Sequence, residues 1–222
     1  MVKKIIVFLS CLCFFDSVIA GPCDEYKKSP EIKLEKAEYD INIKPSDRDL
    51  WPLGGYVTIR PFSYIGPNIG YVFNGKYYCV FLNYVEAKVG FRDFEITIDK
   101  KYEEGSCEYD AVLDHENQHI ADSVDALDNV FSRVKDALYE AADAVEPIYL
   151  EEADDVPYAV EKIQKQVTEY KKLKDLVDEF KEQQNKDAAH LDGTPDEHLQ
   201  KCQQDKMKSA FEKYYKKKGI KK

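Results

Sequence analysis

His115, Glu116 and His119 form the residue pattern with the clearest chemical meaning in the chain. On a helix, residues four positions apart share one face, so the two imidazoles can converge on one cation. Neutral imidazole nitrogen suits zinc, and zinc lowers the pKa of a bound water towards neutrality. The pattern predicts Zn²⁺ held by His115 and His119, with Glu116 as the general base that takes a proton from water.

The rarity of histidine makes this spacing informative. The chain contains only 4 His, so a chance His-Glu-x-x-His is expected in well under one of about a hundred such chains. The alternative is that both histidines are solvated residues on the polar face of an amphipathic helix. A third possibility is a descendant of an enzyme that no longer binds metal.

The motif and its surroundings, about 30 residues beginning at Phe94, resemble the zincin metallopeptidases, in which a helix with this motif lies beside a small sheet. The resemblance implies His115 and His119 as zinc ligands and Glu116 as general base. It also implies an edge strand that binds the substrate backbone by strand addition, for which 94–99 and a neighbouring strand of the sheet are equal candidates. The context also looks like that of small bacterial exported proteins.

A catalytic zinc needs three protein ligands and an open position, and Asp122 is the first candidate for the third. It follows His115 by seven residues and so stays on the metal face of the helix. Its side chain is short, so it either binds the metal directly or orients His119 as a hydrogen-bond partner. A solvated surface aspartate is the remaining interpretation.

Other candidates for the third ligand stay open. Metzincins place their third ligand at the position of Asp125, but on an unbroken helix that residue points about 80° away from His115. Glu140 has the spacing of a gluzincin ligand and would require a break in the helix. His190, His198 or an acidic residue of the C-terminal helices could fold back to complete the site.

A helix must carry the motif, and the hydrophobic spacing predicts one. From Ile120 to Val145 apolar residues recur in alternating steps of four and three, which is the stripe of an amphipathic helix. No Gly or Pro interrupts the segment before Pro147. We therefore expect one unbroken helix from about Ser106, with the motif near its start.

Residues 31–106 show the pattern of β-strands. Phe94, Ile96 and Ile98 alternate with polar neighbours, as in a strand with one buried face. The segments on either side of Asn74-Gly75 are rich in aromatic residues, which predicts a hairpin with a two-residue type I′ turn.

The segment beyond Pro147 is expected to be helical. A second apolar stripe runs from Val160 to Phe180, and Asp192-Gly193 ends it. Thr194 is then the predicted N-cap of a last helix.

These elements predict an α+β fold: a small, mostly antiparallel sheet, then the long motif helix, then two further helices packed on it, in a zincin-like arrangement. Residues 1–20 read as a signal peptide, because two lysines precede a short apolar run and small residues stand at the cleavage position. Residues 21–146 are the expected catalytic domain, and 147–222 a helical C-terminal extension packed on it.

Removal of the signal leaves four cysteines: Cys23, Cys79, Cys107 and Cys202. An even number in an exported chain predicts two disulfides, and the sequence leaves three pairings open. Because Cys107 lies just before the helix, a bond to Cys79 would tie the helix to the sheet.

The net charge of the chain limits the partners that it is expected to bind. The formal net charge of −10 argues against nucleic acid or an anionic membrane surface as a partner, and no membrane span is expected after signal removal. The sequence therefore predicts a periplasmic or secreted zinc metallopeptidase that acts on peptides or proteins. The alternative is a non-enzymatic helical interaction or metal-binding protein of the cell envelope.

Overall fold

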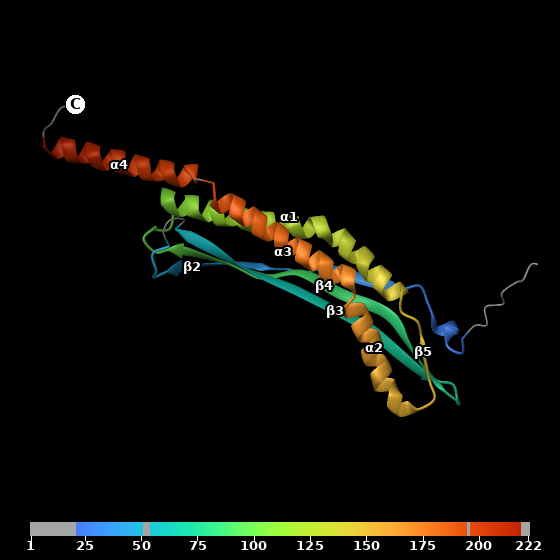
Figure 1. Cartoon of the computed structure of the whole chain (residues 1–222). Coiled ribbons are helices and arrows are strands. Elements are labelled where there is room, and N and C mark those ends of the chain that lie inside the picture. The colour runs from blue at the N-terminus through green and yellow to red at the C-terminus, as the bar shows by residue number, and fades with distance from the viewer. Residues whose placement is uncertain (1–20, 51–53, 195, 219–222) are drawn as a thin grey trace, which may run out of the picture.

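A computed structural model gives the structure of the chain and describes residues 21–50, 54–194 and 196–218. The expected signal peptide, residues 1–20, lies outside the described residues, as does Pro195. The fold is α+β, with a five-stranded sheet and α-helices on one of its faces (Figure 1).

The chain begins with strands and ends with helices. In order, the elements are η1 (Asp24–Tyr26), β1 (Glu31–Lys36), β2 (Asp40–Ser46), β3 (Gly55–Phe73), β4 (Tyr78–Asp99), α1 (Cys107–Asp143), β5 (Ile148–Leu150), η2 (Ala153–Asp155), α2 (Val156–Thr168), α3 (Lys171–Asp192) and α4 (Glu197–Lys218).

The sheet is built around β4, to which every other strand pairs. β3 lies antiparallel to β4 along nearly its whole length, and β5 pairs antiparallel to the start of β4. β1 and β2 run parallel to successive parts of β4. The expectation of a mostly antiparallel sheet is therefore wrong. The sheet is mixed, because β1 and β2 pair with a strand far along the chain and not with each other.

The predicted hairpin exists, but its turn is longer than expected. Phe73 pairs with Tyr78, so four residues connect β3 to β4. The Asn74 side chain closes the turn by accepting hydrogen bonds from the backbone N–H groups of Lys76 and Tyr77, at 3.1 Å each. Only Gly75 has a positive φ, of 90°, whereas a type I′ turn needs two such residues.

β3 continues through two prolines that would end a central strand. Within the described residues it pairs only with β4, and a proline on an edge strand forfeits no ladder hydrogen bond. Register shifts at Arg60/Pro61 and Asn68/Ile69 absorb the irregularity. The result is one strand of 19 residues, of which the sequence pattern predicted only the part next to Asn74-Gly75.

α1 confirms the predicted motif helix. The Ser106 side chain caps it by accepting a hydrogen bond from the backbone N–H of Tyr109 at 3.2 Å, and the helix is unbroken over 37 residues. α3 lies beside α1 in the opposite direction (Figure 1). A bidentate pair from Arg133 to Glu179, at 2.6 and 2.7 Å, joins the two helices.

Three helices follow α1, not two. The second apolar stripe is divided between α2 and α3 at Glu169 and Tyr170. The segment after Pro147 also contributes β5 to the sheet. The N-cap of α4 is not Thr194 as expected, because the Asp196 carboxylate accepts the N–H of Leu199 at 2.8 Å.

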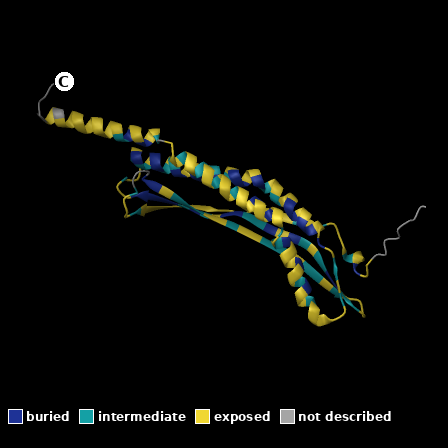
Figure 2. Ribbon diagram, in the orientation of Figure 1, coloured by how far each residue is buried: buried dark blue, intermediate teal, exposed yellow. Residues whose placement is uncertain are grey.

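Two hydrophobic clusters hold the helices on the sheet (Figure 2). One joins the first half of β4 to the end of α1, α2 and α3, and Leu138 and Ile163 are fully buried in it. The other joins the second half of β4 to the start of α1, with Phe94 and Ile96 at its centre. The second cluster supports the helix turns that carry the motif.

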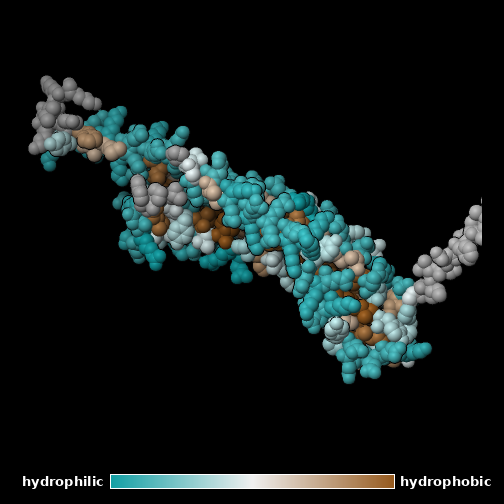
Figure 3. Space-filling view, viewed as in Figure 1, coloured by the Kyte–Doolittle hydropathy of each residue, from teal (hydrophilic) through white to brown (hydrophobic). Residues whose placement is uncertain are grey.

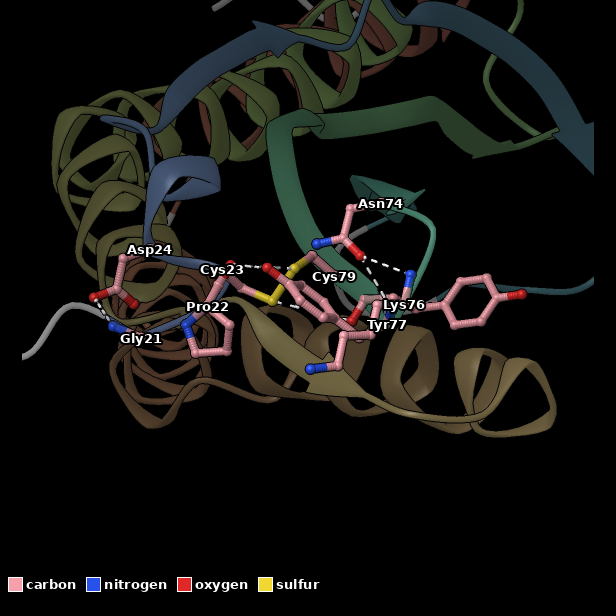
Figure 4. Close-up of a disulfide and its surroundings, with 9 residues drawn as sticks. Gly21, Pro22, Cys23, Asp24, Asn74, Lys76, Tyr77 and Cys79 are labelled. Atoms are coloured by element: carbon pink, nitrogen blue, oxygen red, sulfur yellow. Dashed lines mark hydrogen bonds between the residues drawn. A yellow bond between two sulfur atoms is a disulfide. The ribbon is translucent and has the colours of Figure 1, made fainter.

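Two disulfides tie the chain together, and they differ from the expected pairing. Cys23 bonds to Cys79, and Cys107 bonds to Cys202. The first holds the N-terminal segment against the β3–β4 turn, where the Tyr77 hydroxyl donates to the Pro22 carbonyl at 3.1 Å (Figure 4). The second ties α4 to the first turn of α1.

Among the described residues, no helix is both long and apolar enough to cross a membrane.

Candidate metal centre

His115 and His119 lie one turn apart on α1 and approach each other closely. Their ring centroids are 5.0 Å apart, with the ring planes at 83°. Both side chains are largely buried, at 8% and 10% exposed. The predicted helical placement of both rings is confirmed.

Asp192, the last residue of α3, joins the two imidazoles. Its Oδ1 atom lies 3.3 Å from His115 Nε2 and 3.0 Å from His119 Nε2. The three potential ligand atoms lie within 4.8 Å of one another. A tetrahedral zinc with bonds of about 2.0–2.1 Å separates its ligand atoms by roughly 3.3 Å. The two nitrogen–oxygen distances therefore fit two edges of such a site.

The position of Asp192 at a helix C-terminus is unfavourable for a carboxylate. The helix dipole places partial negative charge there and favours cations, yet the Asp192 side chain lies beside the two imidazole rings. An acidic residue at the end of an amphipathic helix was the one sequence signal that could have pointed to it. The separation of 73 residues from His119 hid the contact.

Glu116 lies at the interface between α1 and the start of β3, where its Oε1 is close to Gly55. It is 1% exposed, and neither carboxylate oxygen has a hydrogen-bond partner among the described residues. Burial raises the pKa of Glu116 to about 7, and the charge of Asp192 raises it further, while the nearby Val57 backbone N–H opposes the shift. The Val57 N–H is near the carboxylate but makes no well-aligned hydrogen bond with it. A buried carboxyl paired so weakly is costly when ionised, so it fits a site in which a bound group interacts with it.

Two glycines allow β3 to pass close to Glu116. A Cβ on Gly55 would lie 2.6 Å from Val112 Cγ1 and 3.1 Å from Glu116 Oε1. Gly54 has a φ of 80°, a conformation that favours glycine. These residues bring the backbone of β3 against the carboxylate, and the sequence reasoning missed them.

Asp99, at the end of β4, anchors the segment that leads to these glycines. Its carboxylate accepts the backbone N–H of Leu50 at 3.1 Å and that of Lys101 at 3.0 Å, and it pairs with the Lys101 ammonium at 2.9 Å. Burial opposes its ionisation, but these hydrogen bonds and the ammonium charge lower the pKa of Asp99 to about 2. The entry to β3 is thereby fixed beside α1.

The other candidates for the third ligand lie elsewhere. Asp122 is on the same helix, where its Oδ1 accepts a hydrogen bond from Gln118 Nε2 at 2.6 Å. Asp125 is exposed, and Glu140 pairs with Lys172 at 2.6 Å near the far end of α1. His190 is exposed two residues before the end of α3. Of the candidates left open, an acidic residue of the C-terminal helices lies beside the imidazoles, and that residue is Asp192.

His198 belongs to a second group of potential ligands. Its ring lies near the sulfur atoms of Cys107 and Cys202 and 3.8 Å from an Asp114 oxygen. The two cysteines are bonded to each other, so their sulfur atoms are occupied. This group therefore adds no ligand to the motif histidines.

An apolar groove of about 270 Å³ lies between α1, α3 and the middle of β3. Leu127 and Val134 line it from the face of α1 that carries Glu116, about three and five turns further on. Gln184 of α3 also lines it, and its buried Nε2 has no hydrogen-bond partner among the described residues. The groove and the metal centre are thus bordered by the same three elements.

Comparisons with protein-family models, with characterised proteins and with solved structures find no significant match. The resemblance to zincins therefore rests on the motif and its context alone. The function proposed below rests on the geometry of the candidate metal centre.

Proposed function

We propose that the protein is a zinc-dependent hydrolase, with His115, His119 and Asp192 as metal ligands and Glu116 as general base. The observation that carries the proposal is the convergence of Nε2, Nε2 and Oδ1 from two antiparallel helices, beside a buried carboxyl without a partner. Two nitrogens and one carboxylate oxygen form a donor set typical of catalytic zinc.

Zinc bound by these three groups would supply Lewis acidity and lower the pKa of water at its open position. Glu116 is suited to the proton transfers, because a carboxylate next to the two histidines can take a proton from water and release it to a leaving amine.

Peptides are the proposed substrates because the centre adjoins an edge strand and an apolar groove. β3 begins at Gly55 beside Glu116 and has one edge unpaired within the described residues. An extended chain can add to such an edge through backbone hydrogen bonds. The groove could then receive an apolar side chain of the same substrate.

Export to the periplasm or the cell exterior is part of the proposal. The two disulfides, Cys23–Cys79 and Cys107–Cys202, are compatible with an oxidising compartment, where such bonds form and persist.

Substitution of Glu116 by Gln tests the reaction without removing a metal ligand. We expect Glu116→Gln to keep about one zinc per chain while hydrolysis of an unfolded protein substrate falls by at least about 100-fold. Glu38→Gln, at an exposed position, is the matched control and should keep both zinc and activity. Zinc content by mass spectrometry and product release are measured on the same samples.

A non-enzymatic zinc protein is the second candidate, and one observation favours it. Both Glu116 oxygens are closed to solvent, so a substrate reaches them only if β3 and α1 separate locally. In that case the protein would bind zinc, and neither it nor Glu116→Gln would show turnover. Absence of zinc binding at micromolar metal would exclude both candidates.

A further inference from the structure

The C-terminal part of α4 is held at its base and extends away from the rest of the molecule (Figure 1). Leu199 is buried, Cys202 is bonded to Cys107, and Lys206 pairs with Glu108 at 2.7 Å. After Lys206 the described side chains are exposed (Figure 2). We refer to residues 207–218 as the α4 tail.

One face of the α4 tail is apolar. Met207, Ala210, Phe211 and Tyr214 form a continuous surface, with the spacing of one helix stripe. Met207, Phe211 and Tyr214 are 56%, 61% and 55% exposed, and the patch is visible at the projecting end of the molecule (Figure 3). Aromatic and methionine side chains displayed in this way mark an interaction surface and not a solvated helix face.

Lysines border this stripe. At 100° per residue, Lys208 and Lys213 fall on either side of it, and Lys217 and Lys218 lie within or beside it one turn beyond Tyr214. Glu212 is the one acidic residue of the α4 tail, and it falls on the opposite face. Among the described side chains, Lys208, Lys213, Lys216 and Lys217 form no ion pair.

The tail therefore carries a net charge of opposite sign to the whole chain. Five lysines against Glu212 make it strongly basic, while the chain as a whole has a formal net charge of −10. Twelve helical residues span about 18 Å, and charges are screened over about 8 Å at physiological ionic strength. The last turns of α4 are thus screened from the negative charges on the rest of the chain. The net charge of the whole chain therefore does not give the sign of the charge on this surface.

We propose that the α4 tail docks on the anionic surface of a lipid bilayer, with its apolar stripe at the headgroup–acyl boundary and its lysines at the lipid headgroups. A helix with a narrow apolar face bordered by lysines has the form of an interfacial anchor, and long lysine stems let the ammonium groups reach the headgroups. Each basic residue near such a surface adds electrostatic attraction. The exported location proposed above would give the tail access to membrane lipids.

Vesicle co-sedimentation of the full chain tests the proposal. The probes are vesicles of phosphatidylglycerol and phosphatidylcholine, compared with vesicles of phosphatidylcholine alone. We expect at least tenfold tighter binding to the anionic vesicles, with binding reduced by added salt. Two double variants, Met207→Ser/Phe211→Ser and Lys208→Gln/Lys213→Gln, should each weaken binding by at least tenfold.

A matched variant separates the tail from total charge. Lys76→Gln/Lys162→Gln removes the same charge from exposed positions outside α4 and should leave vesicle binding unchanged. All substituted tail residues are exposed, so the variants should keep the zinc content and helicity of the parent chain. Equal loss of binding in the matched variant would overturn the proposal.

Two further results would also overturn it. One is the absence of binding to anionic vesicles by a folded full chain. The other is concentration-dependent self-association that the tail variants abolish, without vesicle binding, since the acidic body of a second copy would then be the partner of the α4 tail.

Discussion

Asp192 decides whether the two motif histidines form a metal site or a pair of surface-facing rings. Its side chain is 45% exposed, so burial does not force it against the imidazoles. Helix electrostatics disfavour it at the C-terminus of α3. The carboxylate nevertheless lies within hydrogen-bond distance of His119, and this placement supports the ligand role proposed for it.

Removal of this carboxylate should weaken zinc binding. We expect Asp192→Ala to raise the dissociation constant for zinc by at least about 100-fold, since even loss of a residue that only supports a ligand costs 10- to 100-fold. Asp122→Ala is the matched control on the motif helix, and competition with a chromogenic chelator is the measurement. Equal weakening by both variants, or weakening by Asp122→Ala alone, would assign the third position to the helix itself.

Glu116 shows the cost of the proposed chemistry to stability. Its folded-state pKa of about 7 lies above the ordinary glutamate pKa of 4.5, so the folded protein holds this proton more tightly than the unfolded chain. The carboxyl therefore imposes no penalty below about pH 4.5. Its ionisation penalty grows as the pH rises from 4.5 to about 7 and then stays constant.

In the metal-free protein, Glu116→Gln should thus increase stability at pH 8. The shift corresponds to about 3 kcal/mol in the free energy of unfolding, and the gain should disappear as the pH falls to 4.5. Urea denaturation at several pH values in the presence of a chelator measures it, with Glu38→Gln as the control for loss of one carboxyl. A gain that is the same at all pH values would contradict the buried, protonated carboxyl.

Local sequence signals predicted part of this site. The spacing of His115, Glu116 and His119 places them on one helix because helical periodicity needs only neighbouring residues. Asp192 and Gly55 could not be placed in the same way. Their contacts with the motif depend on how α3 and β3 pack against α1, which no short segment of the sequence encodes.

At the scale of elements, the antiparallel pairing of α1 and α3 positions the centre. The Arg133–Glu179 pair joins the second half of α1 to the middle of α3, and apolar residues of α3 such as Leu173 and Leu176 are buried in the core. The register of α3 is therefore fixed before the chain reaches Asp192. α4, in contrast, depends on the Cys107–Cys202 disulfide at its base.

Loss of that disulfide should release α4 without dismantling the metal centre. We expect Cys107→Ala/Cys202→Ala to reduce stability by about 4 kcal/mol, because the bond closes a loop of roughly 100 residues, and to speed amide hydrogen exchange throughout α4. Zinc affinity should change by less than about threefold, since α3 is held independently. Cys23→Ala/Cys79→Ala is the comparison and should leave exchange in α4 unaffected.

The strands show where sequence patterns stop being sufficient. Alternation at Phe94–Ile98 correctly indicated a strand, and Asn74-Gly75 correctly indicated a hairpin. The turn was predicted wrongly because Asn74 uses its side chain, and not a positive φ, to close it. The parallel pairing of β1 and β2 with β4 was missed because register between distant strands follows from tertiary packing.

At the scale of the whole molecule, the metal centre and the base of α4 lie at the same end. Cys107 precedes His115 by about 12 Å of helix, and the α4 tail projects beyond this end (Figure 1). A bilayer bound by the tail would therefore face the end of the molecule that carries the proposed catalytic residues. The positive charge of the α4 tail then lies at the end that faces the bilayer, and the negative charge lies on the rest of the chain.

We propose that α1 and α3 together bind one zinc ion. Zinc-edge anomalous diffraction from crystals of the zinc-loaded full chain tests it most directly. We predict a single strong peak with His115 Nε2, His119 Nε2 and Asp192 Oδ1 at about 2.0–2.1 Å. A crystal grown with zinc that shows no peak between the two imidazoles, or a peak that Asp192 does not contact, would contradict the account.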